Sequence, residues 1–209
     1  MVVLSIHARW FQRHGLCPET TGRTTPSAPS PQATGEATGE AKGEPTVNAL
    51  EQRLQRLEDI EAIRQLKAAY LHHCDRKNIA AIRECFAAGA VHIDYGTLGT
   101  FTTRDEFLSL YEELACHAHI IDMHHGQNAR IQWHSPHQAS AVWDLYFHQI
   151  DNHHQTLTQL AGYYEDDYER RDNRWLITRS VFRVTSSCVV QMDDTQLRLL
   201  FAGAQPPAS

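Results

Sequence analysis

The sequence has no long hydrophobic run and no basic stripe, and these two absences limit its partners. No apolar stretch approaches the roughly 20 residues that a membrane-spanning helix requires, so a transmembrane protein is not expected. Acidic and basic residues are interspersed, and the formal net charge is −6. Because nucleic acids and anionic membranes attract basic surfaces, the composition disfavours both as partners.

Cysteine is sparse, and its spacing excludes two common uses. The five cysteines are odd in number and form no CxxC pair, so neither a disulfide framework nor a zinc knuckle is predicted. The simplest interpretation is a cytoplasmic protein with reduced thiols. The cysteines are Cys17, Cys74, Cys85, Cys116 and Cys188.

Histidine is abundant, but no metal motif accompanies it. There are fourteen histidines and no HExxH sequence. Doublets such as His124–His125 place their side chains on opposite faces of an extended strand. We therefore predict no metal site, and at most one member of that doublet belongs to any one pocket.

Both ends of the chain differ in composition from the middle. Residues 22–46 contain Pro, Gly, Ser, Thr and a TGEATGEAKGE near-repeat without large apolar side chains, which predicts a disordered linker. Residues 1–47 are interpreted as a dispensable leader, with an organelle-targeting peptide as the alternative. The folded domain is predicted over 48–190, and the tail 191–209 is expected to fray unless QLRLLF docks as a closing flap.

The folded part is predicted to begin with a long helix from residue 48. Asn48, with Glu51 three residues later, is expected to cap its start. Shorter helices are predicted over 79–88 and 104–118, the latter capped by Thr103. Apolar residues at spacings of three and four predict one buried stripe along the long helix: Leu50, Leu54, Leu57, Ile60, Ile63, Leu66, Tyr70 and Cys74.

Strand patterns dominate the rest of the chain. VHIDYGTLGTF (91–101) has the β-branched residues and glycines of a hairpin or two short strands. Helices followed by a run of antiparallel strands predict an α+β fold, a curved antiparallel-rich sheet wrapped around the helices with a pocket inside. The later strands, separated by turn-forming SPH, DNHH and RDN, are predicted over 120–133, 138–150, 155–171 and 174–190.

Four motifs in this order resemble the SnoaL-like branch of the nuclear transport factor 2 superfamily. They are RLEDIEAIRQLKAAYLHHCDRKN (56–78), AVHIDYG (90–96), MHHGQN (123–128) and GYYEDDYERRDNRW (162–175). The similarity is greatest to bile-acid 7α-dehydratases and more distant to scytalone dehydratase and the polyketide cyclases. It implies a cone-shaped α+β barrel that forms a homo-oligomer. The superfamily also contains isomerases, dehydrochlorinases and binding proteins, so the fold does not select the activity.

The dehydratase pattern implies three catalytic residues, Tyr70, Asp75 and His124. Elimination next to a carbonyl needs a base for a C–H proton, a donor for the enolate oxygen and a proton for the departing hydroxide. Histidine suits the first task, and an aspartate on its other ring nitrogen fixes the tautomer. Tyr70 would then be the phenol donor, and no cofactor is required.

Three further residues are expected to contact substrate: Tyr95, Phe147 and His148. Phe147 stands where those dehydratases carry an acidic residue, so one polar partner is absent. Their final-strand arginine corresponds to Arg183 or Val184, and a shift of one residue would turn it to the other face.

The resulting hypothesis is a cofactor-independent lyase or isomerase acting by proton abstraction on a small apolar cyclic ketone or enone, steroid-like or polyketide-like. The alternative is a non-catalytic binding or assembly module of the same fold, which Phe147 would favour. Structural interpretations also remain open, with Tyr70 as a core tyrosine, Asp75 as a helix-end residue and His124 as a buried histidine. Tyr163, Tyr164 and Tyr168 would line either a cavity or a subunit contact.

Overall fold

The computed structural model describes residues 47–192 and 197–203. Residues 1–46, which make up nearly all of the predicted leader, lie outside the described residues. The helices are α2 (Val47–Asp75), α3 (Ile79–Arg83) and α4 (Arg104–Ala115), with a 3-10 turn η1 (Gly96–Leu98). The strands are β1 (Ala90–Asp94), β2 (Thr100–Thr103), β3 (Ile120–Ser135), β4 (Gln138–Asp151), β5 (Thr156–Arg171), β6 (Arg174–Met192) and β7 (Leu197–Gly203).

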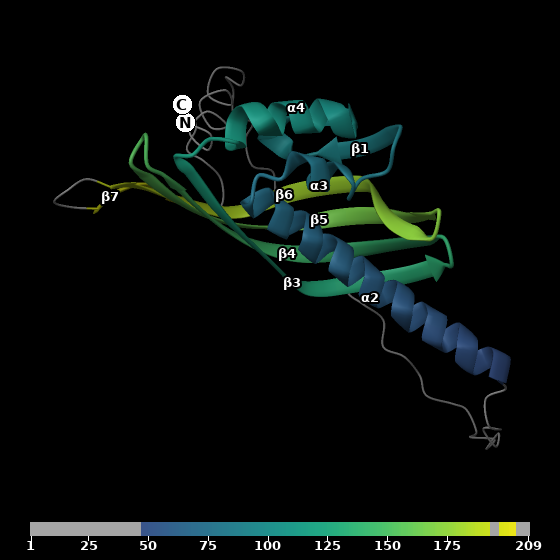
Figure 1. Cartoon of the computed structure of the whole chain (residues 1–209). Coiled ribbons are helices and arrows are strands. Elements are labelled where there is room, and N and C mark those ends of the chain that lie inside the picture. Colours follow the sequence, from purple (N-terminus) through teal and green to yellow (C-terminus); the bar gives the residue numbers. More distant parts are fainter. Residues whose placement is uncertain (1–46, 193–196, 204–209) are drawn as a thin grey trace, which may run out of the picture.

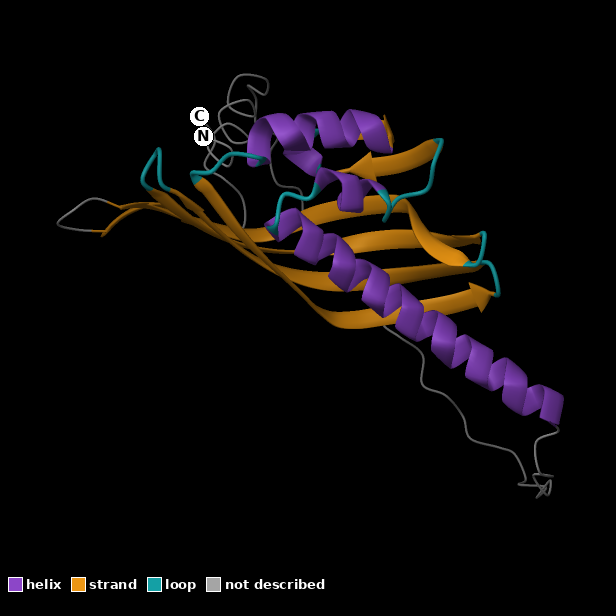
Figure 2. Ribbon diagram, viewed as in Figure 1, coloured by secondary structure: helices purple, strands orange, loops and turns teal. Residues whose placement is uncertain are grey.

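The strands form one curved sheet in the order β2-β1-β6-β5-β4-β3, and β7 pairs with β6. β1 runs parallel to β6, and the other pairs are antiparallel. Figures 1 and 2 show α2 crossing one face of the sheet, with α3 and α4 on the same side. The predicted α+β fold, a curved sheet around one long and two shorter helices, is confirmed.

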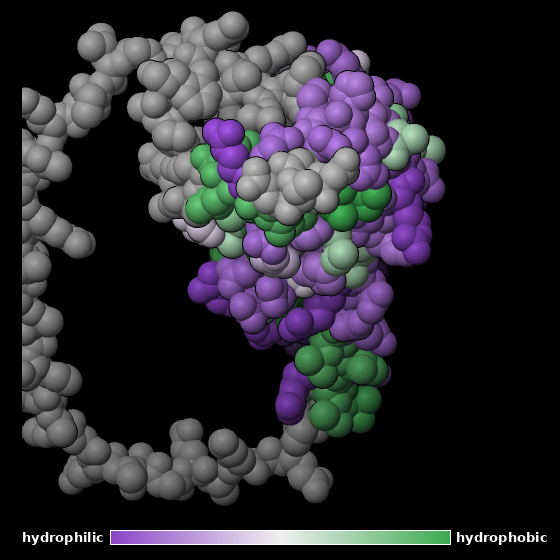
Figure 3. Space-filling view, turned by 90° about the vertical axis from the view of Figure 1, so that its left-hand side faces the viewer, coloured by the Kyte–Doolittle hydropathy of each residue, from purple (hydrophilic) through white to green (hydrophobic). Residues whose placement is uncertain are grey.

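The long helix is buried along only part of the predicted stripe. Ile63, Tyr70 and Cys74 are buried against the sheet. Leu50, Leu54 and Leu57, predicted to be buried, are exposed because the first turns of α2 run past the edge of the sheet (Figure 1). Figure 3 shows hydrophobic side chains at the lower end of the molecule, where the described chain begins.

The helix ends differ from prediction in three places, one of which is the end of α4 at Ala115 and not at residue 118. Asn48 was predicted as a cap but lies inside α2, where its side chain accepts a hydrogen bond from Gln52. α3 ends at Arg83, before residue 88, because the following residues pair with β6. The Thr103 cap is confirmed, since Thr103 and Glu106 form a reciprocal capping box at the start of α4.

The long strands begin and end close to their predicted limits. Side chains alternate along them, so that every second residue faces the helices and builds the core. The predicted tail supplies the end of β6 and all of β7, so the folded part of the chain extends beyond residue 190. No helix among the described residues is long and apolar enough to cross a membrane.

Candidate active site

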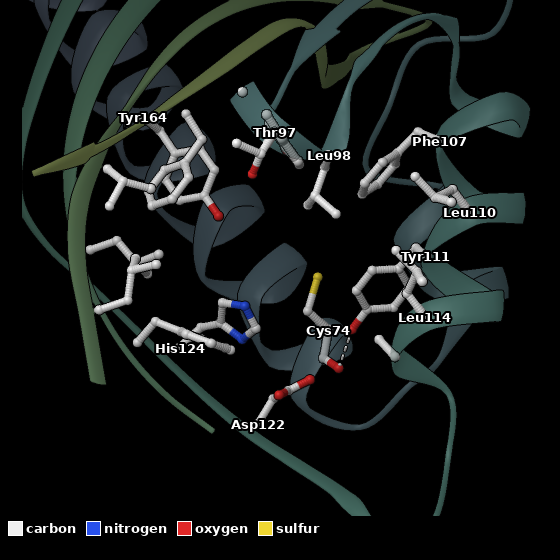
Figure 4. Close-up of a pocket in the computed structure, with 18 of the residues that line it drawn as sticks. Cys74, Thr97, Leu98, Phe107, Leu110, Tyr111, Leu114, Asp122, His124 and Tyr164 are labelled. Carbon is white, nitrogen blue, oxygen red and sulfur yellow. Dashed lines mark hydrogen bonds between the residues drawn. The ribbon is translucent and has the colours of Figure 1, made fainter. Parts of the chain in front are cut away.

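A cavity of about 430 Å³ lies between the concave face of the sheet and the helices (Figure 4). The end of α2, α4, the connection from β1 to β2 and strands β3 to β6 all contribute to its wall. A cavity of this size accommodates a small cyclic molecule. Most of the lining is apolar: Leu98, Phe101, Phe107, Leu110, Leu114, Ala115, Leu145, Phe147, Leu160, Phe182 and Val184.

His124 lines this cavity, and Asp75 contacts it from behind the cavity wall. Asp75 is the last residue of α2, and His124 faces inward from β3. The Asp75 carboxylate lies 2.6 Å from the His124 Nδ1 and also accepts the His124 backbone N–H at 3.0 Å. A continuing helix would have turned Asp75 away from the face of Tyr70, but the helix ends here and frees the carboxylate to reach the strand.

The imidazole of His124 is oriented by this contact. Because the Asp75 carboxylate accepts from Nδ1, the neutral form of the ring carries its hydrogen on Nδ1 and a lone pair on Nε2. No described residue forms a hydrogen bond with Nε2, and Figure 4 shows the ring entering the cavity. His125, the next residue, is exposed on the other face of the sheet.

Tyr70 and Tyr95 both line the cavity, and their hydroxyls are 2.9 Å apart. The Tyr95 hydroxyl also lies 3.1 Å from Oγ of Ser180. Burial raises the pKa of both phenols well above the ordinary value, so both stay protonated. Both tyrosines thus lie at the cavity, and the hydrogen bond between them was not predicted from the sequence.

A second cluster of polar side chains, centred on Asp122, was not predicted from the sequence. Asp122 is nearly fully buried, lines the cavity, accepts a hydrogen bond from Gln149 at 2.8 Å and forms an ion pair with Lys77. Asp122 precedes His124 by two residues, so strand alternation placed both on one face. The spacing of two residues from His124 could therefore have identified Asp122 as a cavity residue from the sequence.

Arg183 borders the cavity, but it pairs with Tyr163 and so faces the other side of the sheet, where its exposed guanidinium donates to the Asp94 carboxylate at 3.0 Å. Next to Arg183, the register of β5 and β6 shifts between Ala161 and Gly162, where Thr185 is the extra residue of β6. A Cβ on Gly162 would lie 2.4 Å from the Arg183 carbonyl oxygen, so the two strands approach closely at the bulge only with glycine there.

The side chains of Phe147 and His148 lie on opposite faces of the sheet. Phe147 pairs with His124 across β3 and β4, and their ring centroids are 4.6 Å apart inside the cavity. His148, expected to contact substrate, does not line the cavity. It is the next residue on β4 and therefore faces the opposite side of the sheet.

The three tyrosines of β5 have different positions. Tyr164 lines the cavity, and Tyr168 is buried beneath α2 with its hydroxyl bonded to Asp166 at 2.8 Å. Tyr163 faces the other side of the sheet by alternation. Of the two expected positions, Tyr164 therefore takes the cavity and Tyr163 the opposite face of the sheet, while Tyr168 lies in the core.

Cys74 lines the cavity but is buried as a thiol. Burial raises its pKa from 9.0 to about 12, so it is neither a thiolate nucleophile nor a thiolate ligand near neutral pH. The rings of His117 and His119 stack near those of His153 and His154. Within the described part of the chain, however, no group of three or more His, Cys, Asp or Glu side chains could hold a metal ion.

A family model described as SnoaL-like domain matches residues 55–181. The chain belongs to the SnoaL-like domain family. No curated protein matches this SnoaL-like sequence.

Solved structures share the fold of this SnoaL-like chain. One is a proposed scytalone dehydratase from Novosphingobium aromaticivorans, with a TM-score of 0.59 and 20% identity over 74% of this chain and 98% of that one. Another is a hexachlorocyclohexane dehydrochlorinase, LinA-type3, from Novosphingobium barchaimii, with a TM-score of 0.58 and 19% identity over 74% and 99%. At this identity the similarity establishes the fold alone.

Proposed function

We propose that the chain is a cofactor-independent lyase or isomerase that removes a proton from carbon next to the carbonyl of a small apolar cyclic ketone or enone. The observation that carries this proposal is the 2.6 Å contact between Asp75 and the His124 Nδ1 at the wall of a mainly apolar cavity. A histidine held in this way presents Nε2 as a base where water is largely displaced by ligand.

The proposed step begins with transfer of a C–H proton to Nε2 of His124. Asp75 stabilises the imidazolium that forms, while the C–H electrons move to the carbonyl oxygen as an enolate. In a dehydration, the enolate re-forms the carbonyl and expels the β-hydroxyl, which takes the proton from His124 and leaves as water. In an isomerisation, the same proton returns to a different carbon. No proton is gained or lost overall.

Two further observations support this reaction class. The cavity wall is dominated by aromatic and aliphatic side chains, with polar groups at His124, Asp122 and Gln149, which suits an apolar ring bearing a few oxygens. The structurally similar proteins described above carry names that denote elimination reactions, dehydration for one and dehydrochlorination for the other.

Proton abstraction can be measured without knowing the natural substrate. In heavy water, the wild-type protein is expected to catalyse exchange of deuterium into the carbons beside the carbonyl of 2-decalone, a bicyclic ketone. His124→Ala and Asp75→Asn should each slow the exchange by roughly 100-fold or more, because positioned base catalysis contributes about 10²–10⁴-fold. Nuclear magnetic resonance of the probe reports the exchange.

His125→Ala is the matched control, since this neighbouring histidine lies on the other face of the sheet. It should leave the exchange rate unchanged. If 2-decalone binds but exchanges equally with wild type and both dyad variants, the proposal fails. The alternative of a non-catalytic binding module, favoured by Phe147 in place of an acidic partner, would then apply.

A further inference from the structure

The hydrogen bonds behind the cavity converge on one buried carboxylate, Asp166. Lys67 lies 2.7 Å from Asp166, and both side chains are almost completely buried. Burial lowers the pKa of Lys67, and the adjacent Asp166 carboxylate opposes that shift. Ser180 donates to Asp166 at 2.7 Å and Tyr168 at 2.8 Å. A carboxylate paired with an ammonium only accepts hydrogen bonds, so every group around it must donate inward.

This direction determines where the hydroxyl hydrogens of the cavity tyrosines point. The one hydrogen of Ser180 is used on Asp166, so in its 3.1 Å contact with Tyr95 the serine accepts. Tyr95 has then used its own hydrogen, and in its 2.9 Å contact with Tyr70 it accepts in turn. The hydrogen of Tyr70 is therefore directed at Tyr95 and away from the cavity.

Tyr164 is in the opposite situation. Its side chain is 5% exposed and lines the cavity, yet its hydroxyl has no hydrogen-bond partner among the described residues. It is not an enclosed, unsatisfied group either, because the one such atom found in the described chain is Oγ of Ser187. Figure 4 shows the Tyr164 hydroxyl turned into the open middle of the cavity, on the side from which His124 enters.

The ring of Tyr164 is held firmly in this direction. It packs against Phe182 with centroids 4.7 Å apart and against Tyr95 at 5.8 Å. The Lys67 ammonium lies 3.5 Å from its centroid, a cation–π contact with the face of the ring. Burial raises the pKa of this phenol well above its ordinary value, so it remains a hydrogen-bond donor at neutral pH.

We infer that Tyr164, and not Tyr70, is the phenol that donates to the ligand's carbonyl oxygen. The inference rests on the proposed function for its catalytic meaning. As the C–H proton passes to His124, charge collects on that oxygen, and the Tyr164 O–H shares its hydrogen without transferring it. Tyr70 presents only lone pairs to the cavity and would accept a hydrogen bond from a ligand hydroxyl.

The infrared carbonyl stretch of bound 2-decalone, labelled with ¹³C at the carbonyl, tests this assignment directly. A donated hydrogen bond lowers the stretching frequency. We expect the lowered frequency in the wild-type protein and in Tyr70→Phe, and its loss in Tyr164→Phe. The exchange rate in heavy water should also fall by roughly 10²-fold or more in Tyr164→Phe, as expected for one lost oxyanion donor.

Tyr163→Phe is the matched control, because this tyrosine lies on the other face of the same strand. The spectroscopic result is independent of turnover. A lowered frequency that disappears only in Tyr164→Phe would support the assignment even if no exchange were seen, in which case only the proposed function fails. A frequency that is retained in Tyr164→Phe, is lost in Tyr70→Phe, or is never lowered would overturn the assignment, as would failure of the probe to bind.

Discussion

His124 and His125 are neighbours in sequence with different surroundings. His124 is partly buried, contacts Phe147 and bonds to Asp75 at 2.6 Å, whereas His125 is exposed. The same side chain therefore lines the cavity at one position and contacts solvent at the next. Tyr163 and Tyr164 repeat this contrast on β5.

Cys74 shows how burial alone can set the chemistry of a residue. It lies between Tyr70 and Asp75 on the last turn of α2, beside the proposed base, yet desolvation raises its pKa from 9.0 to about 12. Cys85 is affected in the same direction, to about 11. Above pH 9.0, where the thiols of an unfolded chain ionise, both buried thiols stay neutral until the pH approaches their raised pKa values.

Alkaline pH should therefore destabilise the protein through these thiols. The folded pKa lies above the unfolded one, so the stabilisation is complete below pH 9 and is lost as the pH rises from 9.0 towards about 12 for Cys74. Each buried group would lower the free energy of unfolding by up to about 1.4 kcal/mol per pH unit. Urea unfolding between about pH 9 and pH 11, where the thiol of an unfolded chain ionises and the buried thiol does not, measures this slope.

Cys74→Ala should have a shallower slope than wild type over the same range. Any loss of packing in this variant lowers stability at every pH and does not change the slope. Equal slopes in the two proteins would contradict the assignment of the pH effect to Cys74.

At the scale of elements, two buried charges fix α2 against the sheet. Asp59 accepts from the indole nitrogens of Trp133 at 3.0 Å and Trp175 at 3.2 Å. About two turns further on, Lys67 reaches Asp166. These contacts fix the rotation of α2 about its axis and its position along that axis. They thereby bring Asp75 level with His124.

Asp59→Ala should cost about 3 kcal/mol or more of unfolding free energy, because it leaves two indole N–H groups and the Arg170 guanidinium without their buried acceptor. Glu58→Ala, one residue earlier and exposed, should change it by about 0.5 kcal/mol or less. Urea unfolding followed by circular dichroism provides both values. Similar stability of the two variants would show that Asp59 does not anchor the helix.

At the scale of the whole molecule, the outer face of β3 and β4 carries exposed apolar side chains. Ile121 is 50% exposed, Met123 46% and Tyr146 38%. The homo-oligomer expected from the family resemblance stays a prediction, and this face is where we expect contact. Replacing Met123 and Tyr146 together by glutamate should reduce the molecular mass found by light scattering to that of one chain. A wild-type protein that is already monomeric would refute this expectation.

The order and type of the elements were determined by the sequence itself. Periods near 3.6 and 2 in the apolar residues follow from the geometry of a single helix or strand, so the capped α4 and the four long strands were predictable. The resemblance to a known family also located Tyr70, Asp75 and His124. Exposure of Leu50 to Leu57 was not predictable, because it depends on where the sheet ends beneath the helix.

Only the tertiary structure decided which polar groups meet. Asp75 and His124 are 49 residues apart, and Lys67 and Asp166 are 99 apart, distances over which local patterns carry no information. The pairing of Arg183 with Tyr163 sets which way Arg183 faces, and the partners of Ser180 set where the tyrosine hydrogens point. Hydrogen-bond direction is a property of the assembled network, since each hydroxyl has one hydrogen and its neighbours determine how that hydrogen is used.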